Sequence, residues 1–297
     1  MLGKVELRIL SNLEDRDTLK GVIEKTGLSK GRVSIATRNL ENLGFIVRER
    51  RGRRIYLRTG NTLHASLLFD FLREYPSIPI EKILTHRRIS MLSIIEYSRI
   101  SLIAEIIGVS RQAVYNAIKD FLRYGILVRR NGYKINPRHE ILKRFVLEYQ
   151  GFINRMEMKK VDDGAVLLWE RGPEFLVKTN RRIEKENYHL TATSAFTRFG
   201  LLFISSHNYY FYSKRDVSSA SEVIIHTLLA NPDSKTSIAY ACLLYKKTKP
   251  RDLIKVSKIY GMENRASKII KYVDEKQDFK DFPSREDYNE LLKDYLV

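Results

Sequence analysis

Apolar residues in the first half of the chain recur at helical spacing, and a short stretch of alternating apolar and polar residues follows them. Val33, Leu40 and Leu43 fall on one face of a helix. Residues 45–48 and 55–58, which come next, predict two strands joined by a tight turn. The pattern therefore predicts a helix that leads directly into a β-hairpin.

The same order returns 81 residues further along the chain. The coinciding pairs are Gly27/Gly108, Ser29/Ser110, Val33/Val114, Ala36/Ala117, Gly44/Gly125, Val47/Val128 and Arg48/Arg129. Gly27 and Gly108 stand where one helix must end in a sharp turn, which favours positive φ. Ser29 and Ser110 are then placed to cap the next helix. Further helices are expected upstream, over 4–13 and 18–25 in the first copy and over 87–97 and 102–107 in the second.

Helix, helix, tight turn, helix and β-hairpin is the order of a winged helix-turn-helix, and residues 1–137 resemble two tandem copies of it. The resemblance implies a winged helix over residues 1–60, a helical connector over 61–85 and a second winged helix over 86–137. A connecting helix is expected over 138–158 and a C-terminal α+β domain over 159–297. The expected fold class is mainly α with α+β.

The connecting helix carries an apolar stripe with 3-4-3-4 spacing, made of Leu142, Phe145, Tyr149, Phe152 and Met156. This spacing fits the seam of a homodimeric coiled coil, but only over about two heptads. A core stripe between domains is the favoured interpretation. Gly151, inside the stripe, favours the core interpretation.

The C-terminal part mixes strand and helix patterns. A hairpin is predicted over 165–169 and 174–178, around Arg171-Gly172-Pro173, and a short helix over 193–199 precedes a strand at 209–212. Five helices are expected after it, over 219–230, 237–246, 251–260, 264–274 and 285–295.

The two halves of the chain differ in net charge. The chain has 53 Lys and Arg against 35 Asp and Glu, a formal charge of +18, and most of this excess lies in residues 1–150. A positive field concentrated in one half favours a polyanionic partner, and double-stranded DNA fits the resemblance above. The alternative is the charge-rich exterior typical of a thermophilic protein.

The outward faces of the two repeated helices hold the candidate DNA contacts. An α-helix fits the major groove, where its early outward residues meet base edges. The first helix offers Lys30, Gly31, Arg32, Ser34, Ile35 and Arg38, and the second offers Arg111, Gln112, Tyr115, Asn116 and Lys119. Gln112 and Asn116, at i and i+4, could each pair with adenine, or could be merely solvated polar residues.

The first hairpin is the most concentrated cationic segment. It carries Arg48, Arg50, Arg51, Arg53, Arg54 and Arg58, with Glu49 as its one acid. Guanidinium groups on a hairpin tip can reach phosphates or a narrow minor groove. The second hairpin, with Arg129, Arg130 and Lys134, is less charged. We expect the first copy to supply affinity and the second to read more of the sequence.

Several C-terminal segments resemble a second family, the type IV abortive-infection antitoxins and regulators. The segments are 191–201, 209–212, 223–229, 252–254 and 266–273, together with the hairpin region 125–136. The resemblance implies repression of the protein's own operon and neutralisation of a nucleotidyltransferase toxin by the C-terminal domain. The additional N-terminal winged helix departs from that family's pattern.

Motifs for catalysis and cofactor binding are missing. The six histidines lack the spacing of a zinc protease, and neither glycine-rich phosphate-binding motif occurs. We therefore expect no enzyme activity, no cofactor and no metal. Cys242 lies in an apolar run and is interpreted as a buried thiol, and a single cysteine is typical of a reducing compartment. Without a long apolar segment or a signal-peptide pattern, a cytoplasmic location is expected.

The sequence therefore predicts a sequence-specific, double-stranded DNA-binding transcriptional regulator. The alternative is an antitoxin-like regulator whose main partner is a protein bound through the C-terminal domain. A homodimer is compatible with both interpretations.

Overall fold

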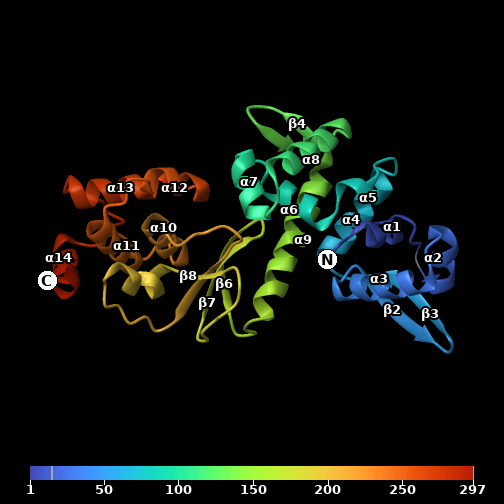
Figure 1. The fold of residues 1–297 in the computed structure, drawn as a ribbon, viewed down its shortest axis with the longest axis horizontal. Helices are drawn as coiled ribbons and strands as arrows, with labels where there is room; N and C mark the ends of the chain where they lie inside the picture. Colours follow the sequence, from blue (N-terminus) through green and yellow to red (C-terminus); the bar gives the residue numbers. More distant parts are fainter. Residues whose placement is uncertain (15, 297) are drawn as a thin grey trace. The chain divides into compact units, whose positions relative to one another are not determined.

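The computed structural model describes residues 1–14 and 16–296, and the chain divides into two compact units. Unit 1 runs from Met1 to Phe152, and unit 2 begins at Ile153, within one continuous helix. Figure 1 shows helices combined with small antiparallel sheets, which confirms the α+β expectation in broad terms.

Unit 1 contains two similar successions of elements. The first comprises α1 (Lys4–Ser11), β1 (Asp17–Thr18), α2 (Leu19–Thr26), α3 (Lys30–Asn42), β2 (Ile46–Arg51) and β3 (Arg54–Thr59). Two helices follow, α4 (Leu63–Glu74) and α5 (Ile80–Ile83). The second succession comprises α6 (His86–Ile94), α7 (Ile100–Ile107), α8 (Arg111–Arg123), β4 (Leu127–Arg129) and β5 (Tyr133–Ile135). The 3₁₀ helix η1 (Pro137–His139) then leads into α9 (Glu140–Lys159).

The tight turn before each of the two 13-residue helices, α3 and α8, is built as the repeat predicts. Gly27 and Gly108 end the preceding helices with φ of 66° and 71°, a conformation that glycine adopts without strain. Ser110 caps α8 by accepting a hydrogen bond from the backbone N–H of Ala113. Ser29 occupies the corresponding position, but its side chain makes no cap hydrogen bond with the described residues. The prediction that the Ser29 side chain caps α3 is therefore wrong, although α3 begins at the expected position.

Aromatic side chains of α9 fill the core of unit 1. Leu142, Phe145 and Tyr149 are fully buried, and the rings of Phe145 and Tyr149 stack at 5.8 Å. Tyr149 also lies 5.6 Å from the ring of Phe45, which follows α3. These three side chains are therefore core residues within one chain, as the core interpretation predicts, whereas Phe152 and Met156 of the same stripe are half-buried.

Unit 2 is built on a four-stranded antiparallel sheet. Its strands are β6 (Val166–Arg171), β7 (Glu174–Thr179), β8 (Tyr188–Leu190) and β9 (Asn208–Tyr212), in the order β6-β7-β9-β8. The helices are the 3₁₀ helix η2 (Ala192–Phe199), α10 (Ala220–Ala230), α11 (Lys235–Thr248), α12 (Leu253–Tyr260), α13 (Glu263–Asp274) and α14 (Arg285–Leu296). The predicted strands and helices are found, with 193–199 forming a 3₁₀ helix and with β8 additional.

Strand β7 is central in this sheet and is buried on both faces. Phe175 and Val177 pack on one side with Met158 and Tyr188, whereas Leu176 belongs to the larger core formed with the helices. That larger core also encloses Cys242, whose thiol is fully buried, as the sequence predicts.

Candidate nucleic-acid interface

Helix α3 buries one face and exposes the other. Its apolar residues Val33, Ala36 and Leu40 are buried, whereas Lys30, Arg32 and Arg38 are exposed, as the spacing predicts. Ser34 is half-buried, and Gly31 is exposed. Ile35 is 71% exposed, which places an aliphatic side chain among the cations of this face.

Helix α8 has the same division. Val114, Ala117, Ile118 and Phe121 are buried, and every predicted contact residue is exposed, namely Arg111, Gln112, Tyr115, Asn116 and Lys119. The side-chain amide of Gln112 donates to Asn116 Oδ1 at 3.0 Å, so the two candidate base-reading amides are paired with each other.

The two helices present cations at equivalent positions. With the repeat offset of 81 residues, Lys30 corresponds to Arg111 and Arg38 corresponds to Lys119. All four side chains are exposed. Both helices therefore carry one cation at their first residue and another about two turns later. Gln112, Asn116 and Tyr115 distinguish the exposed face of α8 from that of α3.

The β2–β3 hairpin carries three exposed arginines that form no ion pair with the described residues, although Arg50 Nε donates a hydrogen bond to the Gly52 carbonyl at 3.3 Å. The strands pair antiparallel from Ile46↔Thr59 to Arg51↔Arg54, and Gly52 lies in the turn. Arg50, Arg53 and Arg54 are exposed, and none of them forms an ion pair within residues 1–14 and 16–296. These three side chains are positioned to meet an external anion.

The other arginines of this hairpin have partners inside the protein. Glu49 accepts hydrogen bonds from Arg58 at 2.8 Å and from Arg51 at 3.1 Å, and these contacts lower the pKa of the Glu49 carboxyl. Arg48 is 16% exposed in its side chain and forms an ion pair with Glu41 of α3. Arg48, counted among the expected DNA contacts, is thus poorly placed to reach a phosphate, because it is shielded and already neutralised.

The β4–β5 hairpin is shorter. Arg129, Arg130 and Lys134 are exposed, as predicted, and the turn runs through Asn131 with φ of 48°. Its strands span only three residue pairs, from Leu127↔Ile135 to Arg129↔Tyr133, so this hairpin presents fewer cations than the first one.

The described residues offer no group of three or more His, Cys, Asp or Glu side chains that could hold a metal ion. Every helix in the described part of the chain is too short or too polar to cross a membrane.

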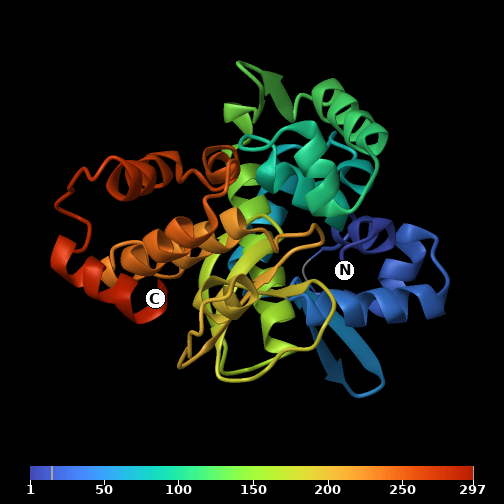
Figure 2. The ribbon, with the colours of Figure 1, turned by 60° about the vertical axis from the view of Figure 1, so that its left-hand side comes forward.

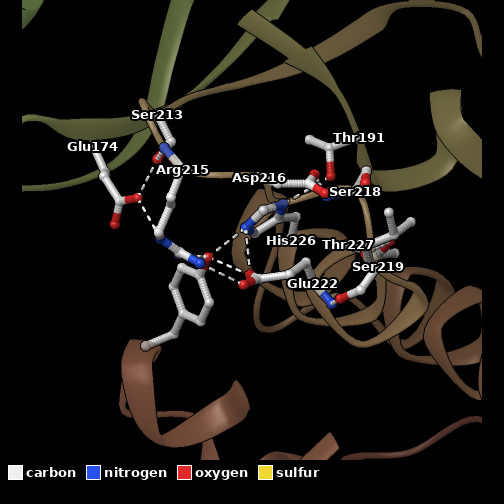
Figure 3. Close-up of polar contacts among 12 residues, drawn as sticks. Glu174, Thr191, Ser213, Arg215, Asp216, Ser218, Ser219, Glu222, His226 and Thr227 are labelled. Carbon is white, nitrogen blue, oxygen red and sulfur yellow. Dashed lines mark hydrogen bonds and ion pairs between the residues drawn. The ribbon is translucent and has the colours of Figure 1, made fainter. Parts of the chain in front are cut away.

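Unit 2 contains a buried polar cluster that sequence reasoning did not find (Figure 3). At its centre, the Arg215 guanidinium donates to Glu174 at 2.8 Å, to Glu222 at 2.6 Å and to the Tyr260 hydroxyl at 2.6 Å. His226 contacts the Tyr260 hydroxyl through Nε2 at 2.9 Å and Thr191 through Nδ1 at 2.7 Å. The cluster links β7, the segment after β9, α10 and the end of α12.

Burial sets the protonation of this cluster. Burial, reinforced by the positive Arg215, lowers the pKa of His226 well below its usual value, so the imidazole is neutral. Burial opposes the charge on Arg215, but Glu174 and the other anionic neighbours outweigh it and raise the pKa of the guanidinium. Burial also raises the pKa of Glu174, against the attraction of Arg215.

The cluster connects the sheet of unit 2 to helices α10 and α12. Its side chains are too buried to contact a substrate. Glu174, Glu222, His226 and Tyr260 are each at most 4% exposed. The ring of His226 stacks on Phe211 of β9 at 4.0 Å. One signal could have indicated it: Glu222 and His226 stand at i and i+4 within the apolar run of α10, where two polar residues need partners.

Comparison with known proteins bears on unit 2 alone. The family described as "HVO_2833_C, C-terminal" matches residues 185–297, a segment that includes Arg215, Glu222, His226 and Tyr260 but not Glu174. This description names no activity. No curated protein and no solved structure matches the chain.

Proposed function

We propose that the protein is a regulator that binds double-stranded DNA through two winged helix-turn-helix units, residues 1–60 and 86–137. The observation that carries the proposal is the repeated surface of α3 and α8. At equivalent positions both helices bury their apolar residues and expose cations, and each is followed by a cationic hairpin.

Each part of this surface has a role that its chemistry suits. The exposed faces of α3 and α8 enter major grooves, where the amides of Gln112 and Asn116 read base edges. Arg50, Arg53 and Arg54 contact phosphates or a narrow minor groove, since they have no ion-pair partner within the described chain. Occupancy of a promoter then blocks or directs transcription.

The decisive experiment is selection of bound duplexes from a random DNA pool by the full-length protein, followed by a salt titration with the enriched sequence. If about 6–10 phosphates are neutralised, affinity should fall roughly 10³–10⁵-fold between about 50 and 200 mM salt. Failure to enrich any sequence, together with an affinity that is insensitive to salt, would refute the proposal.

A second candidate function is suggested by an exposed apolar loop in unit 2. Leu202 and Ile204, in the segment between η2 and β9, are 90% and 97% exposed, which is unusual for aliphatic side chains. A protein partner could cover them, as in the antitoxin-like alternative. Co-purification of a nucleotidyltransferase with the wild-type protein, and its loss in Leu202→Ser/Ile204→Ser, would support this role.

A further inference from the structure

The two cationic surfaces lie on opposite sides of unit 1. Helix α3 packs on α1, α1 packs on α5, and α5 contacts α8, so α3 and α8 flank a helical layer. In Figures 1 and 2, α3 and the β2–β3 hairpin lie at the lower edge of unit 1, and α8 and the β4–β5 hairpin lie at its upper edge.

The exposed residues of each helix therefore face away from the other helix. The buried face of α3, with Val33 and Leu40, is turned toward α1, and the buried face of α8 is turned toward α7 and α5. The exposed face of α3, which carries Lys30 and Arg38, therefore lies on one side of unit 1, and the exposed face of α8, which carries Arg111 and Lys119, lies on the other.

One straight duplex cannot contact both surfaces. A duplex that touched both would have to turn back on itself around unit 1, and the elastic cost of bending grows with the square of the bend angle. A half-turn over a site of about 20–30 base pairs therefore costs about four times as much as the 90° bends that strongly bending proteins impose. Two separate segments avoid this cost.

We propose that the protein holds two DNA duplexes at once, one on the surface of α3 and β2–β3 and the other on the surface of α8 and β4–β5. This inference rests on the proposed DNA-binding function and extends it to bridging or looping of DNA. The matching cations, Lys30 with Arg111 and Arg38 with Lys119, equip each surface to bind independently.

A sandwich assay with the full-length protein tests the proposal. A short biotinylated duplex is fixed on beads, the protein is added, and capture of a second, fluorescent duplex is measured alongside the molar mass of the free protein. Two matched variants each disable one surface: Lys30→Ala/Arg53→Ala/Arg54→Ala and Arg111→Ala/Lys119→Ala/Arg130→Ala. We expect the wild type to bind two duplexes per chain, and each variant to bind one and to lose capture of the second.

Each other outcome overturns the inference in a distinguishable way. One duplex per wild-type chain, with no capture of a second, contradicts bridging and leaves the proposed DNA-binding function intact. Capture that survives in one of the two variants shows that a dimer with a single site per chain does the bridging. Failure of the wild type to bind any duplex removes the proposed function together with the bridging.

Discussion

The side chains of Gln112 and Asn116 are hydrogen-bonded to each other at 3.0 Å across one turn of α8, on an exposed face. Each amide keeps a free oxygen lone pair and a free N–H, the combination that pairs with adenine. The variant Gln112→Ala/Asn116→Ala should therefore lose preference for the selected sequence. We expect a loss of about 1–3 kcal/mol for each bidentate contact, with unchanged affinity for random DNA.

The matched control is Lys119→Ala, which removes a cation from the same face. It should weaken binding to selected and random duplexes by a similar factor and reduce the salt slope by about 1. Both variants are titrated against the selected duplex and against a random duplex. If Gln112→Ala/Asn116→Ala keeps its preference for the selected sequence, α8 does not read bases through these amides.

Ile35 predicts a contact of a different kind. An aliphatic side chain that is 71% exposed on the helix that we propose enters the major groove is suited to contact the methyl group of thymine. Replacing thymine by deoxyuridine in the selected site should weaken wild-type binding about fourfold, corresponding to about 0.8 kcal/mol for one buried methyl-sized group. Ile35→Ala should be insensitive to the same replacement. Equal sensitivity of wild type and variant would rule out the contact.

The arginines of the β2–β3 hairpin should contribute affinity without sequence preference. Arg50→Ala/Arg53→Ala/Arg54→Ala removes three guanidiniums that have no ion-pair partner within the described chain, so binding to every duplex should weaken together. The slope of log affinity against log salt should become shallower by about 3. Arg51→Ala is the internal comparison, because its ion pair with Glu49 already competes with phosphate. If the triple variant changes sequence preference, the hairpin reads bases as well.

The repeated elements could be predicted because local rules dictate them. The left-handed glycines at 27 and 108 and the helical spacing after them depend only on residues a few positions apart. The outward residues of α3 and α8 follow from the same spacing, because the buried positions of a helix determine which positions remain exposed.

The features that the sequence analysis did not predict depend on contacts between segments that are distant along the chain. Arg48 follows the alternation of a hairpin cation, yet its neutralisation by Glu41 requires β2 to return alongside the end of α3. The partners of Arg215 come from residues 174, 222 and 260, and no spacing along the chain connects these positions. Strand β8 is three residues long, too short to give an alternating pattern.

Arg215 should be essential for the stability of unit 2. Its side chain is 9% exposed and pairs with two buried carboxylates, so Arg215→Met leaves Glu174 and Glu222 without their cation. Removing one partner of a buried pair costs about 3–5 kcal/mol. Denaturant unfolding measures the loss, and Arg182→Met, at a side chain that is 82% exposed, should change the free energy of unfolding by less than about 0.5 kcal/mol. A small effect of Arg215→Met would mean that the cluster is not a stabilising link.

His226 should make the stability of unit 2 depend on pH. In the folded protein its pKa is lowered by burial and by Arg215, whereas in the unfolded chain it titrates near 6.5. The contribution of the neutral His226 to the free energy of unfolding is therefore fully present above about pH 6.5. It is lost as pH falls, because the unfolded chain then binds a proton at His226 that the folded protein does not bind. From about pH 6.5 to about pH 5 the free energy of unfolding should fall by roughly 1–2 kcal/mol, since each pH unit well below the unfolded pKa costs on the order of 1.4 kcal/mol.

Other buried groups, among them His139 and Glu174, also have shifted pKa values, so the wild type is compared with a variant that lacks only His226. The pKa of His139 is lowered by burial and acts in the same direction, whereas the pKa of Glu174 is raised and acts in the opposite direction. Both contributions cancel when the free energy of unfolding of His226→Gln, or of His226→Asn, is subtracted from that of the wild type at each pH. The wild-type advantage should shrink steadily below pH 6.5. An advantage that stays constant down to pH 5 would show that the buried imidazole accepts a proton in the folded protein, with Glu222, 3.5 Å away, as its counter-ion.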